Sequence, residues 1–224
     1  MTAPLLSVEQ LAFGYGEHDV LAGVDLALGH KETLVLTGPS GCGKSTLLRL
    51  IAGLEKPSRG AIALNGTTLS SPAFVVPTEQ RPIGMVFQGL ALFPHLTVEG
   101  NIAFGLRHLD KTQRREAVKE YLALLGLEGL GERLPSEISG GQQQRVAVAR
   151  SLARKPQLLL MDEPFSDLDL STRESVREAV KTALQRSGTA AIIVSHDQKD
   201  AEHMAHRIVR MEAGHIVEPS AVGA

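Results

Sequence analysis

Close to its N-terminus the sequence reads Gly38-Pro39-Ser40-Gly41-Cys42-Gly43-Lys44-Ser45-Thr46. This run matches the phosphate-binding pattern GxxxxGK(S/T), and it follows an apolar strand pattern and opens a helical one, as the motif requires. Its glycines allow successive backbone N–H groups to curl around a phosphate, and the following helix N-terminus adds partial positive charge. We expect Lys44 to reach the β- and γ-phosphates of a nucleotide and the Ser45 hydroxyl to ligate Mg²⁺. The loop alone does not distinguish a kinase, a GTPase and an ATPase.

Strand patterns and amphipathic helical patterns alternate on both sides of this loop. Strands are expected at residues 6–13, 20–28, 32–36, 61–64, 85–87, 158–161 and 190–194. Helices are expected at 45–52, from Asp110 to Gly126, after a capping box of Ser171 and Glu174, and at 197–205. Continuous apolar strands between such helices imply an α/β fold with a mainly parallel sheet covered on both faces. We predict an α/β core at 1–88 and 156–224 that includes an antiparallel N-terminal β part, and a helical insertion at about 89–155.

Composition limits the class of protein. The 224 residues, 43% of them hydrophobic, suit one large domain or one domain with an inserted lobe. A net charge of −2 gives no electrostatic footprint for nucleic acid. The single cysteine, Cys42, cannot form an internal disulfide, so we expect a reducing cytosol and assign it no redox role. We see no secretory signal and no apolar run of the ~18–20 residues that span a bilayer, so any membrane role needs a spanning partner.

A second motif combines an apolar strand with two acids. The strand pattern of Leu158–Met161 ends in Asp162, Glu163 and Pro164. Ligands of open α/β sheets bind at the carboxyl ends of the strands, so both acids are expected to face the phosphate loop. Asp162 is then the natural Mg²⁺ partner, and Glu163 is positioned to orient and deprotonate an attacking water.

A third motif joins glycines to a helix start. Ser139-Gly140-Gly141-Gln142 follows Ile138 and precedes a helical stretch at 146–153. Ser139 can cap the helix, and the helix dipole favours an anion at that end. The residues leave two interpretations open: an ordinary helix start, or an element that completes the nucleotide site of a second copy in a two-fold dimer.

The order and spacing of these three motifs resemble those of ABC ATPases, and the resemblance extends from Leu6 to about Val217. It implies a P-loop NTPase core of the ABC type that binds ATP and Mg²⁺ and hydrolyses ATP. It also implies a homodimer on ATP binding, in which residues 139–142 of one copy meet the nucleotide of the other.

The resemblance assigns four further positions. Tyr15 matches the aromatic residue on which adenine stacks, and Gln88 matches the glutamine that senses Mg²⁺ and the attacking water and links the site to a membrane partner. Ser166–Asp169 matches the loop that crosses the dimer interface. The resemblance also places Asp169, the last residue of this loop, among the residues that bind the nucleotide. His196 matches the histidine that contacts the γ-phosphate and acts with Glu163.

The sequence departs from the family pattern at four positions. They are Ile138 in place of leucine, Asp167 in place of a small residue, Gly100 in place of an acid, and His206 in place of aspartate. The last two put local structure in doubt and leave the nucleotide chemistry untouched.

The segment Met85–Val98 is similar to ATPases of importers for iron(III), polyamines, thiamine or inorganic anions. This implies integral membrane permease subunits, an extracytoplasmic substrate-binding protein that acts through them, and a cytoplasmic location on the inner face of the membrane. Many such importers carry a C-terminal regulatory domain; because this chain ends soon after Val217, we expect regulation by that domain to be absent or to come from elsewhere.

Three other functions are weighed against this one: an exporter motor, a soluble ABC ATPase of genome maintenance or translation, and an unrelated P-loop kinase or GTPase. The soluble ATPases carry a long coiled coil or two cassettes, which are absent from this sequence. A kinase or GTPase leaves Ser139–Gln142 and His196 unexplained, and the guanine motif Asn-Lys-x-Asp is missing.

Overall fold

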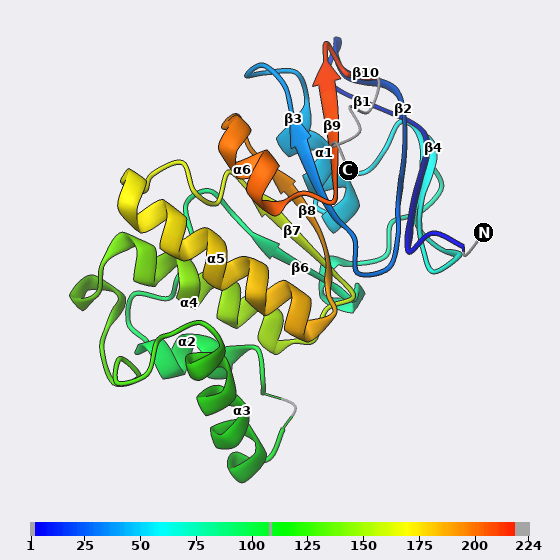
Figure 1. Ribbon diagram of the computed structural model, residues 1–224. Helices are drawn as coiled ribbons and strands as arrows, with labels where there is room; N and C mark the ends of the chain where they lie inside the picture. Colours follow the sequence, from blue (N-terminus) through cyan, green and yellow to red (C-terminus); the bar gives the residue numbers. More distant parts are fainter. Residues whose placement is uncertain (1–2, 108, 218–224) are drawn as a thin grey trace.

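The computed structural model describes residues 3–107 and 109–217, and its larger sheet runs through the centre of the molecule (Figure 1). The sheet has six strands in the order β10-β9-β3-β8-β7-β6. Their bounds are β3 Thr33–Thr37, β6 Ile83–Val86, β7 Leu158–Asp162, β8 Ala190–Val194, β9 Arg207–Glu212 and β10 His215–Val217. Only β10 pairs antiparallel with its neighbour, β9; the other adjacent strands are parallel. The mainly parallel sheet predicted from the sequence is therefore confirmed.

A smaller antiparallel sheet is formed by the N-terminal part of the chain. Its strands lie in the order β2-β1-β4-β5, with bounds β1 Leu6–Tyr15, β2 His18–Leu28, β4 Arg59–Leu64 and β5 Thr67–Ser70. Asn65 and Gly66 connect β4 to β5 with positive φ values of 48° and 74°, the conformation of a tight hairpin turn. The strand expected at 32–36 begins at Thr33 and belongs to the parallel sheet.

Helices cover both faces of the parallel sheet. Their bounds are α1 Lys44–Ala52, α2 Val98–Phe104, α3 Lys111–Leu124, α4 Gly140–Ala153, α5 Leu170–Ser187 and α6 Gln198–Met204. Successive side chains of a strand point to opposite faces. In β7, Leu158 and Leu160 join the core that contains α1, whereas Leu159 and Met161 join the core that contains α4 and α5. This alternation explains why the strand is apolar at every position.

The helices α2 and α3 project from the sheet beside α4, on the far side from the N-terminal β-sheet (Figure 1). Asp110 caps α3 as expected, because its carboxylate accepts the N–H groups of Thr112 and Gln113. The predicted fold class, an ABC-type core with an antiparallel β part and a helical insertion, is confirmed. The limits of the insertion at about 89 and 155 stay a prediction. No helix among residues 3–107 and 109–217 combines the length and apolarity needed to cross a bilayer.

The capping box predicted for α5 is wrong. The helix begins at Leu170, and its cap is Asp169, whose carboxylate accepts the N–H of Thr172 at 3.0 Å and the hydroxyl of Ser171 at 2.7 Å. A carboxylate is a stronger acceptor than a hydroxyl, so Asp169 takes the capping position and Ser171 becomes its donor. Hydrogen bonds from Thr172 and Ser171 hold the pKa of the Asp169 carboxyl well below its usual range.

Candidate functional site

The phosphate-binding loop connects the carboxyl end of β3 to the start of α1. Gly38, Gly41 and Gly43 have φ values of 142°, 80° and 104°, a region that disfavours other residues. A Cβ on Gly38 would lie 2.1 Å from the carbonyl oxygen of Met211, on β9. The loop therefore needs glycine both for its curvature and for its approach to the adjacent strand.

Lys44 is buried at the centre of this loop. Its Nζ donates hydrogen bonds to the carbonyl oxygens of Gly38 at 2.8 Å and Pro39 at 2.9 Å. The Cys42 thiol is buried as well, 3.8 Å from the same ammonium. The loop thus holds a positive charge inside its curl, where charge-assisted hydrogen bonds to an anion are strong.

Ser45 and Asp162 meet at the end of the loop. Asp162 ends β7 and is buried, and the Ser45 hydroxyl donates to its Oδ1 at 2.9 Å. Burial raises the pKa of the Asp162 carboxyl, although the Ser45 hydrogen bond opposes the shift. Mg²⁺ binds to one or two carboxylates and completes its shell with water and phosphate oxygens. The pair of oxygens beside a phosphate-binding loop fits that ion.

Glu163 and His196 face one another at the ends of the adjacent strands β7 and β8. Oε2 of Glu163 lies 3.3 Å from Nδ1 of His196. The Glu163 backbone has a φ of 46°, and its N–H donates to the carbonyl oxygen of Val194 at 3.1 Å. A left-handed non-glycine residue costs on the order of 1–3 kcal/mol and is found most often where function requires it.

Gln88 and the start of α4 share a cavity with Glu163. The cavity of about 280 Å³ is lined by Gln88, Gly140, Glu163 and Ser166, with neighbouring residues. Gln88 follows β6, which pairs with β7, so neighbouring strands bring Gln88 and Glu163 to the same edge of the sheet.

Ser139 caps α4 as expected, and it also forms a capping box with Gln142. Its hydroxyl accepts the N–H of Gln142 at 3.3 Å, and the Gln142 side chain accepts the N–H of Ser139 at 2.9 Å. A Cβ on Gly141 would lie 2.3 Å from Cγ2 of Thr172, so this glycine permits α4 and α5 to pack closely. Ser139 and Gly140 are exposed, so the start of α4 is accessible to a second molecule.

Tyr15 ends strand β1 and is 45% exposed. Its hydroxyl donates to Oε1 of Glu55 at 3.2 Å, and its ring meets Phe13 edge to face at 4.8 Å. The neighbouring strand β2 reaches the phosphate loop, since a Cβ on Gly43 would lie 2.7 Å from Leu21. Tyr15 thus offers an exposed ring on the hairpin that packs against the loop.

A family model described as "ABC transporter" matches residues 21–166.

This chain belongs to the ABC transporter family.

Three curated relatives illustrate the similarity of this ABC chain to ATP-binding proteins of import and transport systems. It is 47% identical to the Fe(3+) ions import ATP-binding protein FbpC 2 of Pectobacterium atrosepticum, over 95% of the chain and 61% of that protein. It is 46% identical to the putrescine transport ATP-binding protein PotG of Escherichia coli, over 96% of the chain and 56% of that protein. The spermidine/putrescine import ATP-binding protein PotA of Legionella pneumophila is 45% identical over 96% of the chain and 59% of that protein. The chain therefore spans somewhat more than half the length of these relatives.

A solved structure shares the ABC fold over nearly the whole chain. It is the dimeric structure of a post-hydrolysis state of the ATP-binding cassette MJ0796 bound to ADP and Pi. The TM-score is 0.83 at 29% identity, and the match covers 98% of this chain and 99% of that one.

Sequence motifs do not reveal every side chain that shapes this ABC site. Arg150 of α4 donates to the carbonyl oxygens of Leu90 at 3.0 Å and Ala91 at 2.6 Å, two successive residues with positive φ just after Gln88. On α5, two arginines spaced one turn apart pair with acids beside His196. The one-turn spacing of the two arginines on α5 is visible in the sequence, but that spacing does not identify the acids with which they pair.

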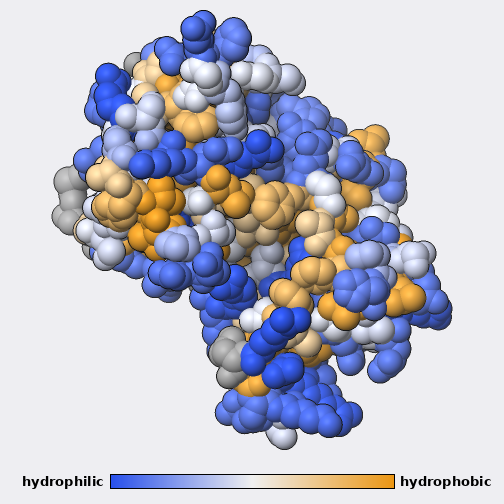
Figure 2. All heavy atoms as spheres, turned by 180° about the vertical axis from the view of Figure 1, so that it is seen from behind, coloured by the Kyte–Doolittle hydropathy of each residue, from blue (hydrophilic) through white to orange (hydrophobic). Residues whose placement is uncertain are grey.

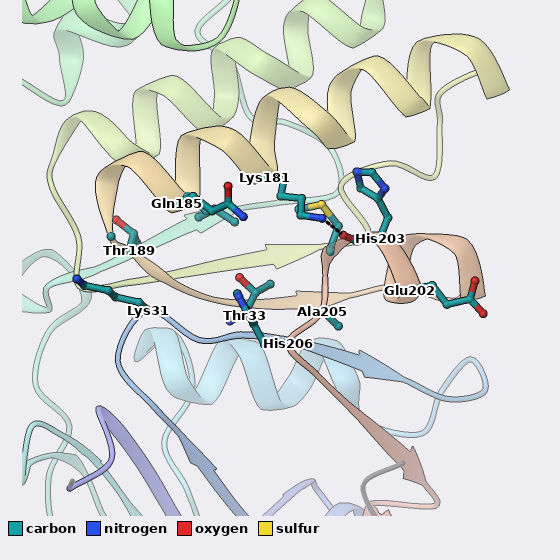
Figure 3. Close-up of a pocket in the computed structure, with 12 residues that line it drawn as sticks. Lys31, Thr33, Lys181, Gln185, Thr189, Glu202, His203, Ala205 and His206 are labelled. Atoms are coloured by element: carbon teal, nitrogen blue, oxygen red, sulfur yellow. Dashed lines mark hydrogen bonds between the residues drawn. The ribbon is translucent and has the colours of Figure 1, made fainter. Parts of the chain in front are cut away.

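Another cavity, of about 520 Å³, opens at the opposite edge of the sheet, where β3 and β8 begin (Figure 3). It contains none of the predicted site residues, and the ammonium of Lys181 is already engaged by the carbonyl oxygen of His203 at 2.7 Å. His206, one of the departures from the ABC pattern, accepts the N–H of Thr33 through Nδ1 at 2.9 Å. An aspartate could accept the same hydrogen bond, so the replacement keeps β3 and β9 connected.

Proposed function

We propose that this ABC chain binds Mg²⁺–ATP and hydrolyses ATP as the motor subunit of a membrane importer. The observation that carries the proposal is the grouping of Ser45, Asp162, Glu163 and His196 at the end of the phosphate-binding loop. A phosphate-binding loop lies beside two oxygens that suit a cation, those of Ser45 and Asp162, and beside a carboxylate that contacts an imidazole. These are the parts that phosphoryl transfer to water needs.

Binding of the nucleotide is assigned to the loop and to one aromatic residue. The N–H groups of Gly38–Thr46 surround the β-phosphate, and Lys44 exchanges its bonds to the loop carbonyls for phosphate oxygens. The exposed ring of Tyr15 stacks on the adenine. Ser45, Asp162 and Gln88 would hold Mg²⁺, which supplies neutralisation of the charge that develops on the phosphates.

Hydrolysis is assigned to Glu163 with the help of His196. The Glu163 carboxylate accepts a proton from the water that attacks the γ-phosphorus, and Gln88 orients that water. The imidazole of His196, 3.3 Å from Glu163, holds the carboxylate in position and contacts the γ-phosphate. Lys44 stabilises the charge on the leaving phosphate oxygens.

We assign the second half of each site to a second copy of the chain. Ser139 and Gly141 of one copy would meet the γ-phosphate bound to the loop of the other, and the segment Ser166–Asp169 would lie at the seam. The exposed, capped start of α4 supports this, because free N–H groups at a helix N-terminus bind anions. The dimeric state of the structural relative, bound to ADP and Pi, supports it as well.

We assign an apolar groove near α2 as the docking site of the membrane partner. The groove of about 390 Å³ is lined by Leu54, Phe87, Phe93 and Phe104, three of which are exposed large hydrophobic residues. On the face seen in Figure 2, hydrophobic side chains gather above the hydrophilic lower lobe. Such a patch fits a protein partner, here a permease at the cytoplasmic face of the membrane that works with an extracytoplasmic binding protein. Co-purification with an integral membrane subunit tests this assignment.

Lys44→Ala is expected to weaken ATP binding by roughly 10–100-fold, because charge-assisted hydrogen bonds contribute about 1.5–3 kcal/mol each. Titration calorimetry with ATP and Mg²⁺ measures the dissociation constant directly. Lys31→Ala is the matched control, since Lys31 lies at the opposite edge of the sheet. Unchanged affinity in Lys44→Ala would contradict the assignment of the loop.

A further inference from the structure

Two arginines of α5 face two acids at the start of α6. Arg173 Nη1 lies 2.7 Å from Asp197 Oδ2, and Arg177 Nη1 lies 3.1 Å from Asp200 Oδ1. The arginines are four residues apart and so lie on one face of the helix. The inner pair is almost fully buried, with exposed side-chain fractions of 8% for Arg177 and 5% for Asp200. Buried ion pairs add little net stability, so stabilisation of the fold does not account for the presence of these two ion pairs.

The acids hold the turn that carries His196. Asp200 accepts the hydroxyl of Ser195 at 2.8 Å, and the same hydroxyl accepts the N–H of Asp197 at 3.1 Å. The residues on both sides of His196 are thereby fixed, while its own side chain is 60% exposed and contacts Glu163. The direction of the imidazole therefore depends on the turn around it, because an exposed ring is little constrained by packing.

Arg173 also reaches the loop that follows Glu163. Its Nη2 donates to the carbonyl oxygens of Ser166 at 3.3 Å and Leu168 at 3.1 Å. Ser166 in turn donates to the carbonyl oxygen of Glu163, through its N–H at 3.3 Å and its hydroxyl at 3.1 Å. The Arg173 guanidinium is thus connected through short chains of hydrogen bonds to the backbone around both Glu163 and His196.

The chemistry of the side chain suits this connection. A guanidinium has donors in a rigid planar fork, so it can bind a carboxylate on one side and two carbonyl oxygens on the other. A lysine ammonium is a point charge and cannot keep all three partners in these directions. Burial tends to raise the pKa of the Asp197 carboxyl, but the Lys199 N–H and the Arg173 guanidinium outweigh it and keep that pKa below its usual value. The acid is accordingly ionised and ready to pair at neutral pH.

We propose that Arg173 is a positioning residue for ATP hydrolysis, which holds the Glu163 loop and the His196 turn in the register that brings the two side chains together. It does so without touching the nucleotide. The proposal rests on the proposed function, because it concerns the same reaction. If residues 166–168 moved, the Arg173 side chain would transmit that movement to the turn that carries His196.

The test measures ATP hydrolysis and ATP binding for Arg173→Gln, alone and combined with His196→Ala. We expect Arg173→Gln to lower kcat by about 10–100-fold at unchanged ATP affinity, because a misplacement near 1 Å costs about that much. Arg173→Lys should restore part of the lost rate, since it can pair with Asp197. In the His196→Ala background, Arg173→Gln should cause a smaller further loss than it causes in the parental chain, because one of the two groups that it positions is already gone.

Controls separate this proposal from the proposed function. Arg186→Gln, an exposed change in the last turn of the same helix, should behave as the parental chain. Parental and Arg186→Gln proteins without ATPase activity would refute the proposed function. An active parental chain with an equally active Arg173→Gln variant would overturn only the role of Arg173, as would a full additional loss in the His196→Ala background.

A second variant covers the case in which Arg173→Gln does not fold. Asp197→Asn removes the charge partner and leaves the two carbonyl contacts of Arg173 in place. The same double-mutant cycle with His196→Ala then applies: non-additive losses support the proposal, and additive losses contradict it.

Discussion

Glu163→Gln is expected to bind ATP like the parental chain and to hydrolyse it about 10²–10⁴-fold more slowly. The amide has the shape of the carboxylate, so the left-handed backbone at this position and its hydrogen bond to Val194 should persist. It cannot accept a proton from the attacking water, so the chemical step loses its base. Because the bridging γ-phosphate is then retained, a long-lived closed dimer should accumulate, visible by size-exclusion chromatography in ATP and Mg²⁺.

The same chemical change elsewhere on the chain serves as the control. Glu178 lies on α5, is 65% exposed and pairs with His203 at 3.1 Å. Glu178→Gln should therefore leave turnover and dimer lifetime unchanged. If Glu163→Gln hydrolysed ATP at the parental rate, the general base would have to be another group.

Ser139→Arg is expected to abolish hydrolysis and to spare ATP binding by the monomer. Ser139 is exposed at the start of α4, so a long cation there is tolerated by the chain itself. In the proposed dimer it would occupy the space of the partner's γ-phosphate and block closure. Steady-state hydrolysis and equilibrium binding of ATP, measured on the same preparation, separate the two effects.

The variant also removes a helix cap, which costs about 1 kcal/mol. Asp110→Ala removes the corresponding cap from α3 and controls for this loss. It should lower thermal stability slightly and leave hydrolysis intact. Normal hydrolysis by Ser139→Arg would argue against a shared site.

The features that could be predicted from the sequence are those that depend on neighbouring residues. The curl of Gly38–Thr46, the apolar strand before Asp162 and the helix cap of Ser139 each arise within a few residues, and the structure contains all three. The two-faced core also followed from pattern, because a strand apolar at every position must be covered on both sides.

Features that depend on distant pairings could not be predicted. Arg173 and Asp197 are 24 residues apart, and they meet only because of the rotation of α5 relative to α6. The close approach of Gly141 to Thr172 likewise appears only when α4 packs on α5. The sequence pattern places the cap of α5 wrongly because two residues able to cap a helix, Asp169 and Ser171, lie two positions apart; in the structure Asp169 accepts both the Thr172 N–H and the Ser171 hydroxyl.

The shared nucleotide site is tested most directly by mixing Lys44→Ala with Ser139→Arg, at an ATP concentration too low for Lys44→Ala to bind. A dimer of one chain of each kind contains one site with an intact Lys44 and an intact Ser139, contributed by different chains, and one site that lacks both. We predict that the equimolar mixture regains roughly a quarter of the parental ATPase activity, because half of the dimers are mixed and each has one working site. A mixture that stays as inactive as its components, with mixed dimers demonstrated by differently tagged chains, would contradict the account.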